Sequence, residues 1–325
     1  MRCRVAAPDK RGTTLKICVL GAGALGCAIG GVLAEAGCTV TLVTRNAAHV
    51  AAINRDGLRL VEQGRERRVV VRAATDCSSL EPMDLVIVLV KSFHTRQAIE
   101  SARAIVRPGT VVLSLQNGLG HEDVLAEVVG RDKVMAGKTY VGGVLLAPGR
   151  ILVGSAGKET LIGELDGRIS PRALAIRDEF RRAGLPITLS ENIVGTMWDK
   201  LLVNVSTGAL SGITALTYGE LYKLPEIEAC ALAAVGEAMA VAKASGVVLA
   251  TREPRDAWLK AAEGLPADFK TSMLQSLEKG SVTEIDFING AVVRWGQRSG
   301  VTTPVNQALV AGIKGIEHRL RPKTA

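Results

Sequence analysis

The feature that most constrains the fold is a short apolar run, residues 15–20, that leads directly into Gly21-Ala-Gly-Ala-Leu-Gly26. In this arrangement the first glycine permits a tight turn, the second lets a pyrophosphate approach the backbone, and the third lets helix and strand pack closely. A helical pattern follows to about Ala36 and ends at Gly37. Its first turn would offer free N–H groups to phosphates. The sequence therefore predicts a strand–turn–helix unit that binds a dinucleotide.

Further apolar runs read as strands, and helical patterns lie between them. The strands are expected over 39–43, 69–72, 85–90 and 111–115, and the helices over 95–106 and 122–129. Strands that are apolar on both faces are typical of a parallel sheet covered by helices. We therefore expect a doubly wound α/β (Rossmann) domain over residues 15–190.

The texture of the sequence changes after about Thr139. Antiparallel strands are expected over 140–153 and 159–164, followed by a helix over 171–183 and a last strand over 186–189. From there the pattern is helical, over 193–210, 224–245, 255–262, 272–277, 283–300 and 304–320. We expect an all-α substrate and catalytic domain over 191–320, with the active site in a cleft that closes between the two domains.

Composition excludes several classes of protein. The 325 residues carry a net charge of +8, but the first 16 hold five basic side chains against Asp9, and those from Lys314 onward hold four against Glu317. With aromatic residues at only 3%, neither a basic stripe nor a base-stacking platform is expected, so we predict no nucleic-acid partner. No apolar run is long enough for a membrane span. Residues 1–14 are expected to be a disordered basic tail of a cytoplasmic protein.

The cysteines and histidines are scattered. None of the six cysteines forms a C-x-x-C pair, and the four histidines lack ligand spacing, so reduced thiols and no metal site are expected. The end of the second strand, Val43-Thr-Arg45-Asn46, has no acidic residue for the ribose hydroxyl of NAD. Arg45 suits the 2′-phosphate of NADP instead, although it could be a solvated surface arginine.

Polar residues follow two of the predicted strands at the edge where open α/β sheets bind ligands. Lys91 follows the strand over 85–90, and Gln116-Asn117-Gly118 follows the strand over 111–115. Either group could be a simple strand cap or turn. Their shared edge with the glycine loop favours a binding site.

Two motifs in the helical half also have both structural and functional interpretations. Lys200 and Asn204 lie four residues apart and hence on one helical face, where Lys200 either snorkels or donates a proton to a carbonyl that is being reduced. Ser281-Val-Thr-Glu284 fits a helix capping box that needs no ligand.

Taken together, the glycine loop, Lys91, Gln116-Asn-Gly118, Trp198-x-Lys200-x-x-x-Asn204, Ser272-Met-Leu-Gln275 and Thr283-Glu-Ile-Asp-Phe-Ile-Asn-Gly290 resemble the ketopantoate reductase family over about residues 15–315. The resemblance implies NADPH-dependent reduction of 2-dehydropantoate to (R)-pantoate. Lys200 is then the general acid, and Glu284 binds the substrate hydroxyl and assists catalysis. The family often has Asp where this chain has Ser276, which bears on substrate fit.

The resemblance implies the following site. Cofactor-binding residues are Gly21, Ala22, Gly23, Ala24, Leu25, Gly26, Arg45, Lys91, Asn117 and Glu284, and substrate-binding residues are Asn117, Lys200, Asn204 and Ser272. The alternatives are a reductase of another 2-keto acid, a relative of the β-hydroxyacid dehydrogenases, and a non-enzymatic NADP sensor. A helical second domain would also allow a homodimer.

Overall fold

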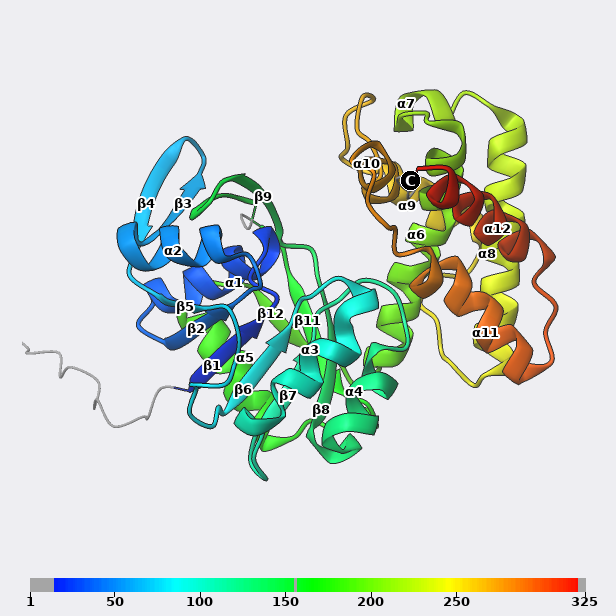
Figure 1. Cartoon of the computed structure of the whole chain (residues 1–325). Coiled ribbons are helices and arrows are strands. Elements are labelled where there is room, and N and C mark those ends of the chain that lie inside the picture. The colour runs from blue at the N-terminus through cyan, green and yellow to red at the C-terminus, as the bar shows by residue number, and fades with distance from the viewer. Residues whose placement is uncertain (1–14, 155–156, 321–325) are drawn as a thin grey trace, which may run out of the picture.

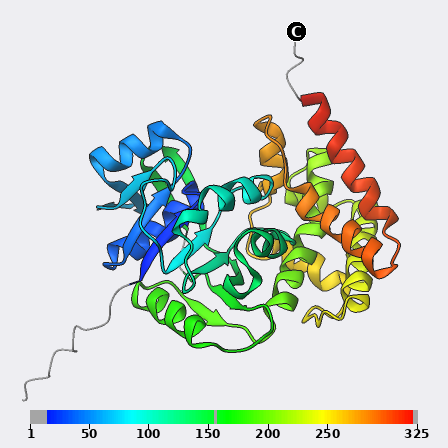
Figure 2. The ribbon, with the colours of Figure 1, turned by 60° about the horizontal axis from the view of Figure 1, so that its bottom comes forward.

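The computed structural model describes residues 15–154 and 157–320. A sheet-containing N-terminal part lies at one end of the molecule and a helical C-terminal part at the other (Figure 1, Figure 2). The predicted fold class, a doubly wound α/β part followed by a helical part, is confirmed. The expected tail over 1–14 lies outside the described residues.

The main sheet carries the glycine loop and the predicted strand-end residues. Its strand order is β12-β11-β8-β7-β6-β1-β2-β5. The bounds are β1 (Lys16–Leu20), β2 (Thr39–Val43), β5 (Arg72–Ala74), β6 (Leu85–Val88), β7 (Val111–Ser114), β8 (Val134–Thr139), β11 (Thr160–Glu164) and β12 (Ile187–Leu189). Strands β5, β2, β1, β6, β7 and β8 are parallel, and β11 runs antiparallel to β8. The carboxyl ends of these six strands therefore form one edge, called here the carboxyl edge, and their starts form the amino edge.

A second sheet packs on the far side of α1 (Ala24–Glu35). It has the order β4-β3-β10-β9, with β3 (Leu58–Glu62), β4 (Arg65–Val69), β9 (Gly142–Ala147) and β10 (Arg150–Gly154). A Cβ atom on Gly30 would lie 2.6 Å from Leu42 of the main sheet, and one on Gly31 would lie 2.7 Å from Leu58 of the second sheet. Helix α1 is thus held tightly between two sheets, which fixes the direction in which its N-terminus points.

The sequence predictions need several corrections in this part. The strand expected over 69–72 is really the end of β4 and the start of β5, while β3 and α2 (Ala47–Asp56) were not foreseen. Strand β8 was also missed. The helix expected over 95–106 breaks near Ala102 into α3 (Thr95–Ser101) and the 3₁₀ turn η2 (Arg103–Ile105). The remaining helices of this part are α4 (His121–Val129) and α5 (Pro171–Arg182), and η1 (Ser92–His94) and η3 (Arg131–Lys133) are further 3₁₀ turns.

Helix α6 (Ile193–Thr214) organises the C-terminal part. Its apolar face, including Trp198, Leu201 and Leu202, is almost fully buried among the other helices. These are α7 (Tyr218–Leu221), α8 (Pro225–Ala244), α9 (Pro254–Ala262), α10 (Ser272–Glu278), α11 (Asn289–Ser299) and α12 (Pro304–Leu320). The helix expected over 283–300 is interrupted: the 3₁₀ turn η4 (Ile285–Phe287) precedes α11.

Helix α6 also contacts β8 and β11, so it joins the two halves. None of the helices in the described ranges is long and apolar enough to cross a membrane.

Candidate active site

The glycine loop, residues 21–26, packs closely against its neighbours at Gly21 and Gly26 and is open to solvent at Gly23. Gly21 and Ala22 donate their N–H groups to the Val43 carbonyl, at 3.0 and 2.8 Å, which ties the loop to the end of β2. A Cβ atom on Gly21 would lie 2.3 Å from the Val90 nitrogen, and one on Gly26 would lie 2.4 Å from the Gly21 carbonyl oxygen. By contrast, a Cβ on Gly23 would meet nothing within 4 Å.

That open side is the N-terminus of α1. Gly23 is its N-cap residue, and Ala24 and Leu25 are its first two residues. Within the described chain, no side chain caps these N–H groups and no acidic residue stands in the first turn. The free N–H groups and the space above Gly23 fit a phosphate group.

Arg45 stands just beyond the carboxyl end of β2. Its guanidinium lies 2.9 Å from His94 Nε2 and donates to Gln97 Oε1 at 3.4 Å. Partial burial and the charge of Arg45 lower the pKa of His94, so the imidazole is neutral at pH 7 and can accept this bond. The side chain is exposed and is oriented by these two contacts.

Glu284 reaches from the helical part to the carboxyl edge. Its Oε1 accepts hydrogen bonds from the Ser92 hydroxyl at 2.6 Å and the Ser92 N–H at 3.2 Å, and its Oε2 lies 3.6 Å from Lys91 Nζ. The capping box over Ser281 and Glu284 does not form, because this carboxylate bonds across the junction instead of capping its own chain.

The loop after β7 joins the same junction. Gln116 Nε2 donates to the Val90 carbonyl and the Thr95 hydroxyl, both at 2.8 Å, and the Asn117 carbonyl accepts from Ser92 Oγ at 3.4 Å. Gly118 has a φ of +94°, and a Cβ there would lie 2.4 Å from the Phe287 carbonyl oxygen. The Leu119 N–H donates to that same oxygen at 3.0 Å. Only glycine fits at position 118, and the loop meets η4 backbone to backbone.

Lys200 is presented to the carboxyl edge by the second turn of α6. Its Nζ donates to the Thr139 carbonyl at 2.9 Å, at the end of β8, and lies 5.6 Å from the centre of the Tyr140 ring. Burial, then the positive charge of Lys138, lower the pKa of Lys200 to about 8, and the negative charge of Glu284 opposes them. Such an ammonium is still mainly charged at pH 7 but gives up its proton readily.

Two predicted substrate residues lie nearby without direct bonds to this group. Asn204 follows Lys200 by one turn of α6 and is half-buried, and Ser272 is exposed at the start of α10, which packs on α6. Among the described residues, neither side chain hydrogen-bonds to Lys91, Lys200 or Glu284. The Ser276 hydroxyl is engaged by its own helix, donating to the Ser272 carbonyl at 2.9 Å.

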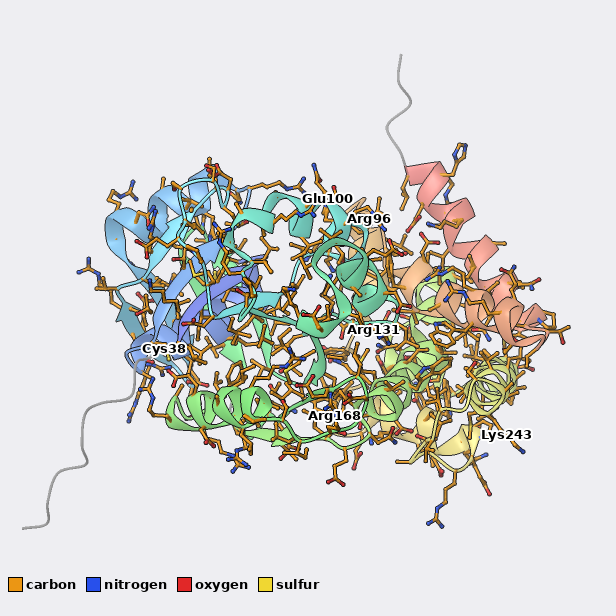
Figure 3. All side chains as sticks on the ribbon, turned by 90° about the horizontal axis from the view of Figure 1, so that it is seen from below. Cys38, Arg96, Glu100, Arg131, Arg168 and Lys243 are labelled. Carbon is orange, nitrogen blue, oxygen red and sulfur yellow. The ribbon has the colours of Figure 1, made fainter. Side chains whose placement is uncertain are left out.

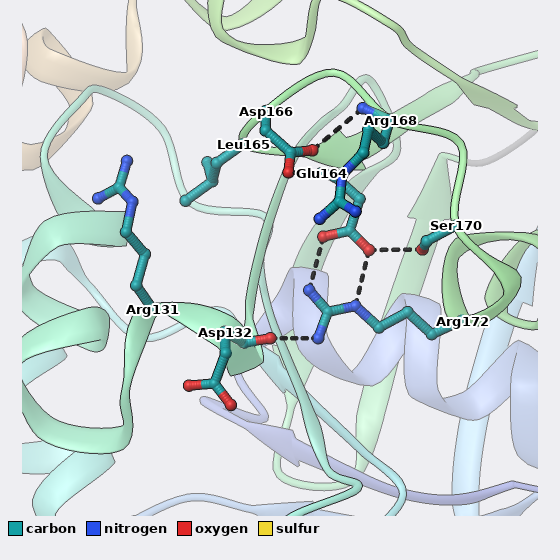
Figure 4. Close-up of a pocket in the computed structure, with 8 residues that line it drawn as sticks. All are labelled: Arg131, Asp132, Glu164, Leu165, Asp166, Arg168, Ser170 and Arg172. Carbon is teal, nitrogen blue, oxygen red and sulfur yellow. Dashed lines mark hydrogen bonds and ion pairs between the residues drawn. The ribbon is translucent and has the colours of Figure 1, made fainter.

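A cavity of about 480 Å³ lies elsewhere, at the amino edge (Figure 4). None of the predicted site residues lines it. Four of its lining charges pair with one another: Glu164 accepts from Arg172, and also from Ser170, and Asp166 accepts from Arg168. Arg131 and Asp132 pair with residues outside the lining, Asp123 and Lys133. Over residues 15–154 and 157–320, no cluster of His, Cys, Asp and Glu could hold a metal ion.

Comparison with known proteins assigns the chain to a family. Residues 17–167 match the family described as ketopantoate reductase PanE/ApbA, and residues 192–317 match its C-terminal family. The 2-dehydropantoate 2-reductase of Halobacterium salinarum is 36% identical over 298 residues, which is 91% of this chain and 96% of that protein. The chain belongs to the ketopantoate reductase family. It is therefore an oxidoreductase.

Solved structures agree with this family. A crystal structure of a PanE/ApbA family ketopantoate reductase from Ralstonia eutropha is 35% identical, with a TM-score of 0.86 over 94% of this chain and 99% of that one. A ternary structure of D-mandelate dehydrogenase with NADH and anilino(oxo)acetate is 27% identical, with a TM-score of 0.85 over the same shares.

Within this ketopantoate reductase fold, sequence reasoning missed three contributors to the site. Ser92 clamps Glu284, the Thr139 carbonyl holds Lys200, and Lys138 adds a second buried ammonium. A contact made by a main-chain carbonyl, such as that of Thr139, cannot be recognised in the sequence, because every residue has this group. Lys138 could have been recognised, because a lysine inside the largely apolar run of β8 is unusual for a buried strand.

Proposed function

We propose that the chain catalyses NADPH-dependent reduction of 2-dehydropantoate to (R)-pantoate, with Lys200 as the general acid. The observation that carries this proposal is the position of the Lys200 ammonium. Helix α6 of the helical part holds this ammonium 2.9 Å from the Thr139 carbonyl at the end of β8, on the carboxyl edge of the sheet, where the charge of Glu284 acts on it. A carbonyl reductase needs a proton donor at this edge, where open α/β sheets bind dinucleotides.

The cofactor we propose is NADP. The open space above Gly23 and the uncapped N-terminus of α1 suit the pyrophosphate, and Arg45 suits a 2′-phosphate. The end of β2 carries no acidic side chain that would repel that phosphate. When bound, a reduced nicotinamide supplies the hydride for the reaction.

The residues of the chain then have separate tasks. Lys200 donates a hydrogen bond to the keto oxygen, stabilises the negative charge that develops there and transfers its proton to that oxygen. Its bond to Thr139 holds the ammonium in place before the substrate arrives. A fixed donor of this kind does not have to reorganise during the reaction.

Glu284 is proposed to bind the substrate hydroxyl. Ser92 holds one of its oxygens with two hydrogen bonds, while Lys91 lies 3.6 Å from the other, which leaves acceptor capacity on the latter oxygen. Lys91 and Asn117 stand on the cofactor side of this carboxylate. Asn204 and Ser272 would complete the substrate contacts from α6 and α10.

A second candidate is the reduction of a different 2-keto acid. It is favoured by the D-mandelate dehydrogenase complex, which matches 94% of this chain and contains NADH and anilino(oxo)acetate. Ser276, where the family often has Asp, also lies one turn from Ser272. We place either reaction in the cytoplasm, and the homodimer stays a prediction.

The deciding experiment is a steady-state assay of the purified protein that follows the absorbance of reduced nicotinamide. We expect NADPH to be oxidised with 2-dehydropantoate at a higher kcat/KM than with benzoylformate or other 2-keto acids, and NADH to be a poorer cofactor. Preference for benzoylformate would establish the second candidate. If the protein binds NADPH but oxidises none of it with any 2-keto acid, the result would instead support a non-enzymatic NADP sensor.

A further inference from the structure

A second lysine lies beside the proposed general acid without a partner of its own. Lys138 is the fifth residue of β8, and its side chain is only 8% exposed. In the described ranges, its ammonium makes no hydrogen bond and no ion pair. Charged groups are rarely left in this state, because removing an ammonium from water without a partner is costly. A role outside folding is therefore worth seeking for this side chain.

The surroundings of Lys138 place it next to Lys200. The neighbouring residue in β8 is Thr139, whose carbonyl accepts the Lys200 bond at 2.9 Å. Both ammonium groups also lie near the same aromatic ring: the centre of Tyr140 is 5.3 Å from Lys138 Nζ and 5.6 Å from Lys200 Nζ. Two like charges are thus held on one ring in a partly buried site.

The carboxylates near this pair are occupied elsewhere. Asp199 and Glu159 act on Lys138 by charge, but Asp199 accepts hydrogen bonds from the Ala250 and Thr251 N–H groups, and Glu159 accepts one from Thr188. Glu284 acts on Lys200 by charge while it is bound by Ser92 and Lys91. Within the described ranges, none of these carboxylates forms an ion pair with Lys138 or Lys200, so neither ammonium has a counter-ion in contact.

We propose that Lys138 is a positioning residue for the general acid: its unpaired ammonium, held on the Tyr140 ring beside Lys200, makes Lys200 a readier proton donor. The inference rests on the proposed role of Lys200. Repulsion from Lys138 destabilises the charged form of Lys200, and the proton that leaves for the keto oxygen relieves that repulsion. This agrees with the direction of the effect of Lys138 on the pKa of Lys200.

The test is the pH dependence of kcat/KM in Lys138→Met, with Lys138→Arg as the matched variant that keeps the charge. In the wild type, activity should fall as the pH rises above about 8, because Lys200 loses its proton there. Without the Lys138 charge, this alkaline limb should move upward by about 0.3 to 1 pH unit. Lys138→Arg should leave it in place, as should Lys243→Met, which changes an exposed lysine at the end of α8 (Figure 3).

A second measurement needs no catalysis. The rate at which acetic anhydride labels Lys200 in the free protein, followed by peptide mass spectrometry from pH 6 to 11, reports the titration of that amine directly. Lys138→Met should shift this titration upward by the same amount, and Lys138→Arg should not. An unshifted titration overturns the proposal. So does a large rise in the KM of the keto acid with an unshifted limb, since Lys138 would then bind substrate.

These outcomes separate the two proposals. If Lys200→Ala keeps its kcat, the general-acid role fails, whatever the labelling shows about the two lysines. If Lys200→Ala is inactive but Lys138→Met titrates like the wild type, only the role of Lys138 fails.

Discussion

Two clusters of charged side chains lie at opposite edges of the main sheet, and they are organised differently. The amino-edge cluster comprises Arg131, Asp132, Glu164, Asp166, Arg168 and Arg172 (Figure 4). The carboxyl-edge cluster comprises Lys91, Lys138, Lys200 and Glu284. The first has three cations against three anions. In the second, the ion pair among these described residues is that of Lys91 with Glu284, and Lys138 is buried and Lys200 half-buried, whereas Lys91 is exposed.

The pairing within the clusters explains their different roles. Glu164 is held by Arg172 through two hydrogen bonds of 2.6 and 2.7 Å; although burial opposes it, these bonds and the one from Ser170 lower the pKa of Glu164. At the carboxyl edge, Lys200 instead has its pKa lowered by burial and by a like charge. Charged side chains that pair with one another stabilise the fold, whereas a surplus of positive charge suits the binding of an anionic ligand. A shifted pKa alone would not distinguish the two edges.

The largest expected effect is that of Lys200→Ala. Removing a general acid should lower kcat by about 10²- to 10⁴-fold, while the Kd of NADPH stays within about threefold. Steady-state kinetics and cofactor fluorescence titration measure the two quantities. The exposed Lys243→Ala, in the helical part, is the control. If Lys200→Ala kept the kcat of the wild type, the carboxyl-edge cluster would have no catalytic role that distinguishes it from the amino-edge cluster.

The next effect belongs to the amino edge. Arg172→Met leaves the buried Glu164 carboxylate without its main partner and should lower the free energy of unfolding by about 2 kcal/mol, less than for a fully buried pair because Arg172 is one-third exposed. Its kcat should be unchanged. Arg168→Met breaks an exposed pair and should leave the free energy of unfolding nearly unchanged. Urea denaturation gives both values. A tenfold loss of kcat in Arg172→Met would contradict a purely structural role.

Arg45→Ala is expected to act on the cofactor alone. Losing charge-assisted hydrogen bonds to a 2′-phosphate should weaken NADPH binding about 10- to 100-fold, with NADH binding nearly unchanged. The ratio of kcat/KM for the two cofactors measures this preference. Arg96→Ala, which breaks the exposed pair with Glu127 on the outside of α3 and α4, is the control (Figure 3). Equal losses with both cofactors would argue against NADP selection by Arg45.

The smallest effects come from two buried groups at the start of α4, close to the carboxyl edge. His121 stacks on Phe287 with neither ring nitrogen bonded in the described chain, and burial lowers its pKa from 6.5 to about 4. Burial raises the pKa of Glu122 from 4.5 to about 7. The stability contributed by neutral His121 is lost as the pH falls from about 6.5 to about 4. That contributed by protonated Glu122 is lost as the pH rises from about 4.5 to about 7.

Between pH 5 and 6, the pH dependence of stability that comes from His121 opposes the one that comes from Glu122. Single variants should separate the two contributions. His121→Phe keeps the stacking on Phe287, and only the pH dependence that comes from Glu122 remains. Its free energy of unfolding relative to the wild type should therefore fall by about 1 kcal/mol as the pH rises from 5 to 6. Glu122→Gln should show a rise of similar size. Urea midpoints at both pH values measure the difference. Parallel changes in the two variants would show that these groups do not titrate as described.

Much of the carboxyl edge could be predicted from local sequence. Lys91 and Asn117 each follow an apolar strand, and parallel strands bring such positions to one edge. The contact between Ser92 and Glu284 could not be predicted, because 192 residues separate them and the spacing of Ser281 and Glu284 favoured a local capping box. Non-local hydrogen bonds of this kind have no periodic signature.

The missed elements have local reasons. The hairpin of β3 and β4 turns at Gln63 and Gly64, both with positive φ, rather than at the usual Asn-Gly, and β4 is largely charged. Strand β8 contains Gly137 and Lys138, which both weaken a strand pattern. Helix α2 did have a recognisable start, because Asn46 caps it by accepting the His49 N–H.

The backbone contact between Gly118 and Phe287 limits how the two halves of the enzyme can move. The Leu119 N–H donates to the Phe287 carbonyl oxygen at 3.0 Å, and Gly118 leaves no room for a methyl group beside that oxygen, so the contact cannot slide without being broken. It should therefore act as a pivot, about which the helical half swings while Glu284 stays near Ser92. Ser272 lies on a different helix from this pivot and would travel farther during such a swing. Substrate entry and product release would then depend on the α10 side.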